Sequence, residues 1–171
     1  MRGDTTSVGL FDALVRVTRD ESLERAVAAI DWALRTGEID FIDVESLALT
    51  SAQAAEAVRL AKIECDSIPE SLAKTRLYLC GHTVRSQVAV VNGVPGERID
   101  LVIDEIVGLE IDGYEFHRDR FEADRNKDES ITLDGWFAMR RSARAVFFGW
   151  ERMHRAIHAA LDQRCRHGPE K

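Results

Sequence analysis

The sequence lacks the long apolar runs of a membrane protein. No stretch of its 171 residues approaches the roughly 20 consecutive apolar residues that a membrane-spanning helix needs. The first residues, MRGDTTSVG, also lack the apolar segment of a secretory signal. We therefore expect a cytoplasmic protein with no membrane partner.

Cysteine is scarce, and its placement excludes two further classes. The three cysteines, Cys65, Cys80 and Cys165, are scattered and form no CxxC pair. An odd, dispersed set suits neither a disulfide framework nor a structural zinc site. Internal repeats and low-complexity tracts are also missing from the sequence. These absences predict reduced thiols in an ordinary globular chain.

A net excess of positive charge is missing as well, although the positive and negative charges are unevenly distributed along the chain. The chain carries 23 basic and 30 acidic residues, a net charge of −7, which argues against a simple polyanion-binding protein. Residues 137–171, however, hold eight Lys or Arg and three Asp or Glu, a net +5, whereas the preceding residues sum to −12. A basic end that contacts phosphate and an acidic centre that binds metal fit this pattern; a solvated helix face is the alternative.

What is present is a hydrophobic content of 45%, enough for one compact domain or for a domain with a helical extension. Helical spacing predicts helices over 8–17, 22–35, 51–64 and 67–79. Two capping-box patterns support the last two: Thr50 with Gln53, and Ser67 with Glu70. We expect a helical lead-in over residues 1–66 and a second domain over residues 67–171.

After Gly81 the hydrophobic period changes to that of strands. Strands are predicted over 84–91, 99–103 and 107–111, with a turn at 92–96, followed by a helix over 118–133, a short strand over 136–140 and a last helix over 151–166. The fold class is therefore α/β (α+β). Its core has the order helix, three strands, helix, strand, helix around a mixed sheet.

We expect three carboxylates to converge in this arrangement if the turn at Asp104-Glu105 is tight. Glu110 and Asp112 alternate along one strand and so share a face, and Asp100 opens the neighbouring strand. Closely spaced acids repel one another unless they take up protons or bind a cation. Mg²⁺ prefers such oxygen ligands and activates water for phosphodiester hydrolysis. The alternative is that these acids form the solvent-exposed face of a surface strand and bind no cation.

Further candidates follow the acidic strand. His117 lies beyond Gly113, where it can act as a general acid or base, or remain a surface histidine. Arg125 lies on the next predicted helix and can hold a phosphate, with a solvated helix face as the alternative. His154 and His158 share a helix face at metal-ligand spacing, but the sequence offers no obvious third ligand, which favours a surface pair.

The run RIDLVIDEIVGLEIDGYEFHRDRFEADRNKDESITLDGWFAMRRSARAV resembles a domain family related to very-short-patch-repair (Vsr-like) endonucleases, within the PD-(D/E)xK restriction-endonuclease-like superfamily. The resemblance rests on Asp100, on an E-x-D-G-x-x-x-H pattern from Glu110 to His117, on Asp124 with Asp128, and on Gly135-Trp136 with Arg140. It extends upstream to SIPESLAKTRLYL, where Glu70 matches the acid of the first core helix. About two thirds of the chain are covered, from residue 67 to residue 161.

The resemblance implies a nuclease-like core with a metal-dependent site. Its catalytic residues would be Glu70, Asp100, Glu110, Asp112 and His117, with Asp100, Glu110 and Asp112 binding Mg²⁺ or Mn²⁺. Arg125 and Arg140 would contact DNA phosphates. Many members of this superfamily carry lysine where this chain has Asp112, so another base must meet the charge of the transition state. Purely structural roles remain open as alternatives: Glu70 as a helix-capping partner, Asp100 as a turn residue, and Trp136 as a core residue.

The first 66 residues, especially TTSVGLFDALVRVTRDESLERAVAAIDWALRTGEIDFIDVESL, resemble the helical segment that precedes this domain in actinobacterial proteins with an AbiEi-type antitoxin-like N-terminus. The winged-helix module of those proteins is not in this sequence. Two functions stay open: a Mg²⁺-dependent DNA endonuclease of repair or phage defence, and a catalytically inactive DNA-binding or regulatory module of a toxin-antitoxin or defence locus. A homodimer and a protein partner from such a locus also remain open.

Overall fold

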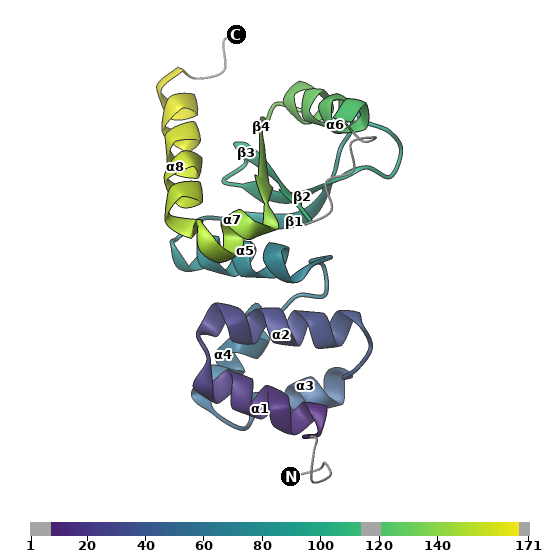
Figure 1. Ribbon diagram of the computed structural model, residues 1–171, viewed down its shortest axis with the longest axis vertical. Coiled ribbons are helices and arrows are strands. Elements are labelled where there is room, and N and C mark those ends of the chain that lie inside the picture. Colours follow the sequence, from purple (N-terminus) through teal and green to yellow (C-terminus); the bar gives the residue numbers. More distant parts are fainter. Residues whose placement is uncertain (1–7, 114–120, 168–171) are drawn as a thin grey trace. The chain divides into compact units, whose positions relative to one another are not determined.

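The computed structural model describes residues 8–113 and 121–167; in 121–124 and 164–167 it describes the backbone only. The described residues form eight helices and a four-stranded mixed sheet, so the protein is of the mixed α+β class (Figure 1). The chain divides into two compact units, Met1–Arg76 and Leu77–Lys171, whereas the sequence predicted a division between residues 66 and 67. None of the described helices combines the length and the apolar composition of a membrane span.

The first unit is helical, as the sequence predicts. It contains α1 (Leu10–Asp20), α2 (Leu23–Arg35), α3 (Phe41–Ala48), α4 (Ala52–Leu60) and the first turns of α5 (Ile68–Leu79). Fully buried side chains such as Ile30 and Leu47 form its core. The sequence reading missed α3, although Asp40 and Asp43 form a reciprocal capping box that begins this helix.

Of the two predicted helix caps, the structure shows the Ser67 cap with its Glu70 partner, whereas the Thr50 cap is wrong. Ser67 accepts a hydrogen bond from the backbone N–H of Glu70 and donates to the Glu70 carboxylate at 2.6 Å. Thr50, in contrast, does not cap α4. Ser51 does so, by accepting from the N–H of Ala54, and Gln53 instead donates to the carbonyl of Glu21. Because Thr50 and Ser51 are adjacent hydroxyl residues and both residue types cap helices, the sequence left the position of the cap uncertain by one residue.

The second unit is built on the sheet, whose order is β1-β2-β3-β4. The strands are β1 (Val84–Ala89), β2 (Arg98–Ile103), β3 (Val107–Asp112) and β4 (Phe137–Ser142). The first three form an antiparallel meander, and β4 runs parallel to β3. Because parallel neighbours need a crossover, helix α6 (Phe121–Leu133) lies between β3 and β4 in the chain. The predicted order of elements is found, with α7 (Ala143–Phe148) as an addition before α8 (Trp150–His167).

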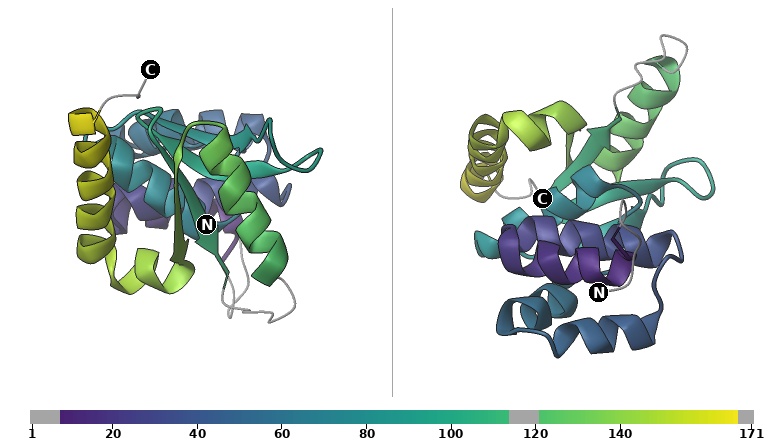
Figure 2. Two further views of the ribbon diagram at one scale, coloured as in Figure 1. Left: turned by 90° about the horizontal axis from the view of Figure 1, so that it is seen from above. Right: turned by 60° about the horizontal axis from the view of Figure 1, so that its bottom comes forward.

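Helices cover both faces of the sheet, with α6 on one side and α8 on the other (Figure 2). Strand β3 is therefore buried on both faces, and Leu109 and Glu110 are almost equally inaccessible. Gly108 permits the close approach of α6, because a Cβ atom there would lie 2.7 Å from Cγ2 of Ile131. Trp136 packs against the buried cluster that contains Ile131, which agrees with its reading as a core residue.

Candidate functional site

The structure brings Asp100 of β2 and Glu110 of β3 together on adjacent strands. Leu101 of β2 pairs with Leu109 of β3, so the two acids occupy the next positions along these strands. The backbone N–H of Asp100 donates to Oε1 of Glu110 at 3.3 Å, and the N–H of Ile111 donates to Oδ2 of Asp100 at 2.7 Å. Each carboxylate is thus anchored by the backbone of the other strand.

Lys127 of α6 completes this pair of acids. Its Nζ donates to Oε2 of Glu110 at 2.5 Å. The side chain of Glu110 is 7% exposed and that of Lys127 is 19% exposed, so solvent screens this ion pair weakly. Burial raises the pKa of Glu110 above its ordinary value even though Lys127 acts in the opposite direction.

Lys127 was missed in the sequence, although a signal for it exists. On a helix, residues four apart lie on the same face, and Lys127 precedes the fully buried Ile131 by four positions. The same spacing places Lys127 on the side of α6 that packs over Gly108 and β3. A lysine on the core-facing stripe of a helix requires a buried partner, and the strand acids are the nearest candidates.

Asp112 and Arg140 form a second charged group on this side of the sheet. Arg140 lies opposite Glu110 in the register of β3 and β4. It donates from Nη1 to Asp112 at 2.7 Å and from Nη2 to Asp128 of α6 at 3.1 Å. Burial acts to lower the pKa of Arg140, but the hydrogen bond and charge of Asp112, together with Asp128, raise it overall, so the guanidinium is always charged.

The three predicted metal ligands do not gather as one set in the part of the chain that the structure describes. There, the only group of three or more His, Cys, Asp or Glu side chains placed to share an ion consists of histidines, described below. Asp100 and Glu110 are adjacent, whereas Asp112 is directed to Arg140. The acids therefore divide into a pair beside Lys127 and a single acid beside Arg140.

The other predicted residues have separate places. Glu70 belongs to the first unit, where it accepts hydrogen bonds from Ser67 and from the N–H of Asp66 at the start of α5. Arg125 is exposed on α6. His117 and the side chain of Asp124 lie outside the described residues.

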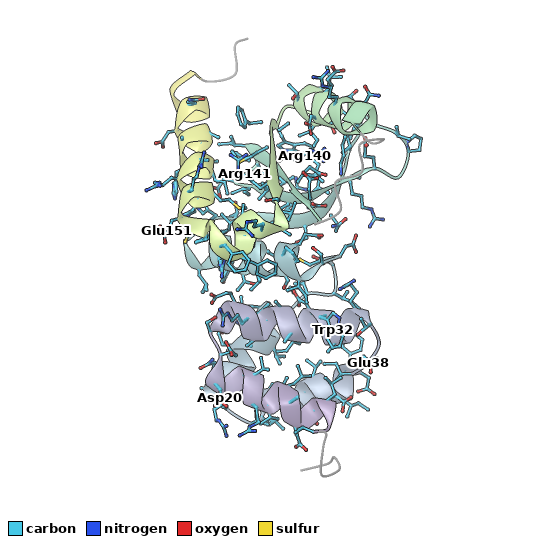
Figure 3. The ribbon with its side chains drawn as sticks, viewed as in Figure 1. Asp20, Trp32, Glu38, Arg140, Arg141 and Glu151 are labelled. Atoms are coloured by element: carbon cyan, nitrogen blue, oxygen red, sulfur yellow. The ribbon has the colours of Figure 1, made fainter. Side chains whose placement is uncertain are left out.

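The neighbouring arginines of β4, Arg140 and Arg141, point to opposite faces of the sheet. Figure 3 labels Arg140 on the α6 side of the strand and Arg141 on the α8 side. Arg141 lines a cavity of about 610 Å³ together with Arg144, Arg152 and Phe148 of α7 and α8. Phe148 is 81% exposed, and the guanidinium of Arg144 lies 5.6 Å from the centre of its ring. Three cations beside an exposed aromatic ring can contact a phosphate and a stacked base.

No family model, curated protein or solved structure matches the chain.

Proposed function

We propose that the second unit is a divalent-cation-dependent DNA endonuclease with Asp100, Glu110 and Lys127 at its centre. One observation carries the proposal: two acids from adjacent strands lie against each other, and a lysine from the crossover helix contacts one of them at 2.5 Å. Phosphodiester hydrolysis uses these groups, because carboxylates bind the cation and an ammonium group stabilises developing negative charge.

The order of elements supports the proposal. A helix, an antiparallel meander, a crossover helix and a strand parallel to β3 follow one another in the second unit and the helix leading into it. This is the order that the resemblance to restriction-endonuclease-like proteins implies. We therefore interpret the sheet as a core of that kind, in which the paired acids occupy β2 and β3.

We propose that Lys127 takes the part of the lysine that this chain lacks in the pattern of the resembling superfamily. The position two residues after Glu110 is Asp112, where many nucleases of this superfamily carry lysine. In this chain the ammonium group comes instead from α6 and reaches the same carboxylate. We assign metal binding to Asp100 and Glu110, and charge stabilisation to Lys127. Asp112 is assigned the role of holding Arg140 in position.

Asp100 and Glu110 would hold the cation, since Mg²⁺ commonly binds one or two protein carboxylates. The cation would supply charge neutralisation and a more acidic water for phosphodiester hydrolysis. Lys127 lies beside Glu110, where its ammonium group would stabilise negative charge that develops on the substrate phosphate.

DNA contact is assigned to the arginines around the cavity of α7 and α8. Arg141, Arg144 and Arg152 lie within the stretch of the chain that carries a net +5. Guanidinium groups bind phosphate oxygens in a bidentate geometry, and these contacts give affinity without reading sequence. The proposed substrate is accordingly DNA without a defined recognition sequence.

Cleavage of supercoiled plasmid tests the proposal. Purified protein is expected to nick or cut plasmid DNA with Mg²⁺ or Mn²⁺ and to be inactive with EDTA. Asp100→Asn and Glu110→Gln should abolish cleavage, and Lys127→Met should slow it by about 100-fold or more. Glu129→Gln is the matched control, because Glu129 is exposed on the same helix and its loss should leave the rate unchanged.

Two outcomes would overturn the nuclease assignment. One is intact plasmid across several divalent ions and DNA structures. The other is cleavage that persists in both carboxylate variants, which would identify a contaminating nuclease.

A second function is favoured by the same ion pair. Because Lys127 already neutralises Glu110, the site is stable without a cation, as expected in a nuclease fold that binds DNA or a regulatory partner without cutting. Calorimetry separates the two functions. The inactive module would bind DNA and take up neither Mg²⁺ nor Mn²⁺, whereas the endonuclease would bind the cation and lose that binding in Asp100→Asn.

A further inference from the structure

A cluster of three histidines lies in the second unit, apart from the acidic pair. His82 follows α5, and His154 and His158 lie one turn apart on α8. One ring nitrogen from each histidine lies within 4.8 Å of the others. The ring centroids are separated by 5.0 Å for His82 and His158 and by 4.4 Å for His154 and His158. His82 is therefore the third histidine of this cluster, which the sequence did not reveal.

The backbone at the end of α5 fixes the position of His82. Gly81 adopts a φ of +91°, in the left-handed region that residues with a side chain rarely adopt. Its N–H donates to the carbonyl of Tyr78, and the N–H of His82 donates to that of Leu77, which is the pattern of a Schellman motif. The chain thus turns sharply, and His82 begins the path into β1.

Asp104 fixes the orientation of the His82 ring. Its Oδ2 lies 2.7 Å from Nδ1 of His82, and its Oδ1 accepts hydrogen bonds from the N–H and the hydroxyl of Thr83. With Nδ1 directed at a carboxylate, Nδ1 carries the proton, and the lone pair is on Nε2. That Nε2 atom is buried and has no hydrogen-bond partner among the described residues.

An imidazole held in this way is prepared for a metal ion. Histidines that bind metals almost always donate their second ring N–H to a carboxylate, a carbonyl or water, which fixes the tautomer and increases the basicity of the ligating nitrogen. A buried polar atom without a partner is also energetically unfavourable. A cation at Nε2 of His82 would remove that cost.

The two histidines of α8 are placed by helical spacing. They are four residues apart, so both project from one face, and their Nε2 atoms lie 3.1 Å from each other. Trp150, four residues before His154, stacks on the His154 ring at a centroid distance of 5.5 Å and an angle of 12°. The stacked tryptophan restricts the ring of His154, whereas His158 is exposed and gives solvent access to the cluster.

We propose that His82, His154 and His158 bind one divalent transition-metal ion of the Zn²⁺ class through their Nε2 atoms, with water in the remaining position. Imidazole nitrogens favour Zn²⁺, Cu²⁺ and Ni²⁺, whereas Mg²⁺ and Mn²⁺ favour oxygen. Three protein ligands plus water is a coordination set that Zn²⁺ adopts in proteins. This site is independent of the acidic pair and does not rest on the proposed nuclease activity.

The ion would join two segments that are distant in sequence. His82 lies between α5 and β1, and the other two ligands lie on α8. An ion that binds the folded state alone adds about RT ln(1 + [metal]/Kd) to the free energy of unfolding. Zinc is therefore expected to raise the melting temperature and to fix α8 to the corner where β1 begins.

Titration of metal-free protein with ZnCl₂ at pH 7.5, in competition with a chromophoric chelator, tests the site. The full chain should bind one Zn²⁺ and melt at a higher temperature with the ion than with EDTA. His158→Ala should weaken binding by about 100-fold or more, and Asp104→Asn by about 10–100-fold through the His82 ring. Because His158 is exposed, His158→Ala is expected to fold.

Two matched controls separate this site from others. His167→Ala removes a histidine from the end of the same helix, and Asp100→Asn removes an acid from the proposed Mg²⁺ site; both should bind Zn²⁺ as the parent chain does. Absence of Zn²⁺ binding in the parent chain would overturn the proposal. Binding that survives His158→Ala, or that is lost in His167→Ala or Asp100→Asn, would overturn it as well.

Discussion

Nζ of Lys127 lies 2.5 Å from Oε2 of Glu110, and this contact joins α6 to β3 through opposite charges that solvent scarcely reaches. A buried ion pair contributes little net stability when it is complete, but the loss of one partner is strongly unfavourable because the other charge remains desolvated. The pair therefore predicts an asymmetric response to substitution, and the response depends on pH.

Lys127→Met should lower the free energy of unfolding by about 2–4 kcal/mol at pH 8, below the loss for a fully buried pair because Lys127 is partly exposed. The pKa of Glu110 is already raised by burial. A carboxyl with a raised pKa in the folded state is most favourable below its unfolded pKa and loses that contribution as pH rises. The deficit of Lys127→Met should therefore shrink at pH 5, where Glu110 can take up a proton. Urea unfolding at both pH values measures it.

The matched control for this experiment is the double variant Lys127→Met with Glu110→Gln. It removes both charges, so it should recover most of the stability lost at pH 8 and should show little pH dependence. A Lys127→Met deficit of equal size at pH 5 and pH 8 would contradict the electrostatic explanation.

Gly108→Ala tests the close approach of α6 to the sheet. The added Cβ would lie 2.7 Å from Cγ2 of Ile131, a fully buried side chain that cannot move aside freely. We expect a loss of about 1–3 kcal/mol in chemical denaturation. Ile131→Ala removes the clashing atom, so the two changes together should cost less than their sum by about 1 kcal/mol. Ile131→Val retains Cγ2 and should not relieve the clash.

A buried network in the first unit gives a separate prediction. Asp31 is 2% exposed and accepts hydrogen bonds from the hydroxyl of Ser71 and the N–H of Lys62, and its Oδ2 lies 3.6 Å from Nζ of Lys74. Asp31→Ala leaves these donors without an acceptor and leaves a buried ammonium group without its counter-charge. A loss of about 3–5 kcal/mol in the free energy of unfolding is expected.

Glu21→Ala is the comparison for Asp31→Ala. Glu21 pairs with Arg25 at 2.8 Å, but both side chains are exposed. Exposed pairs contribute little to stability because water screens them, so this change should scarcely alter the urea midpoint. Equal effects of the two substitutions would show that Asp31 is not stabilised in the way that the structure indicates.

The sequence predicted those parts of the fold that depend on local patterns. Alternation from Val107 to Asp112 and the glycine-rich turn after β1 marked the meander, and helical spacing marked α2 closely. Short elements without a long period, α3 and α7, were not predicted. At the site, Asp100 and Glu110 could be paired because adjacent strands have a fixed register.

Contacts between distant segments could not be predicted in the same way. Lys127 contacts Glu110 across the crossover from β3 to α6, and His82, near the start of the second unit in sequence, lies beside the histidines of α8. The spacing of residues in a single sequence indicates on which face of a helix or strand a residue lies. It does not indicate which helix and strand faces pack against each other. For Lys127 and for His82 the sequence contained only a partial signal. Lys127 lies on the buried face of a helix, and His82 follows the glycine that ends α5.

The arginines around the α7–α8 cavity predict a salt-dependent affinity for DNA. Each phosphate contact contributes about −0.9 to the slope of log K against log salt concentration. Arg144→Gln with Arg152→Gln should therefore make the slope shallower by about 1–2 and weaken binding to all sequences alike. Arg155→Gln, an exposed arginine on α8 outside the cavity lining, should change the slope little. Fluorescence anisotropy with a labelled duplex at several salt concentrations measures this, and equal effects of the two sets would contradict it.

His154 predicts how the metal-free protein responds to acid. Burial, followed by the charges of His158 and His82, lowers the pKa of His154, and Glu151 opposes this only in part. A histidine with a lowered pKa binds its proton more tightly in the unfolded chain, so the folded state loses stability as pH falls below about 6.5. With EDTA present, the free energy of unfolding should fall from pH 7.5 to pH 5.5, and His154→Gln, which cannot take up a proton, should show a smaller fall. His167→Gln should retain the full dependence. An unchanged pH dependence in His154→Gln would show that other titrating groups, and not this imidazole, govern the acid response.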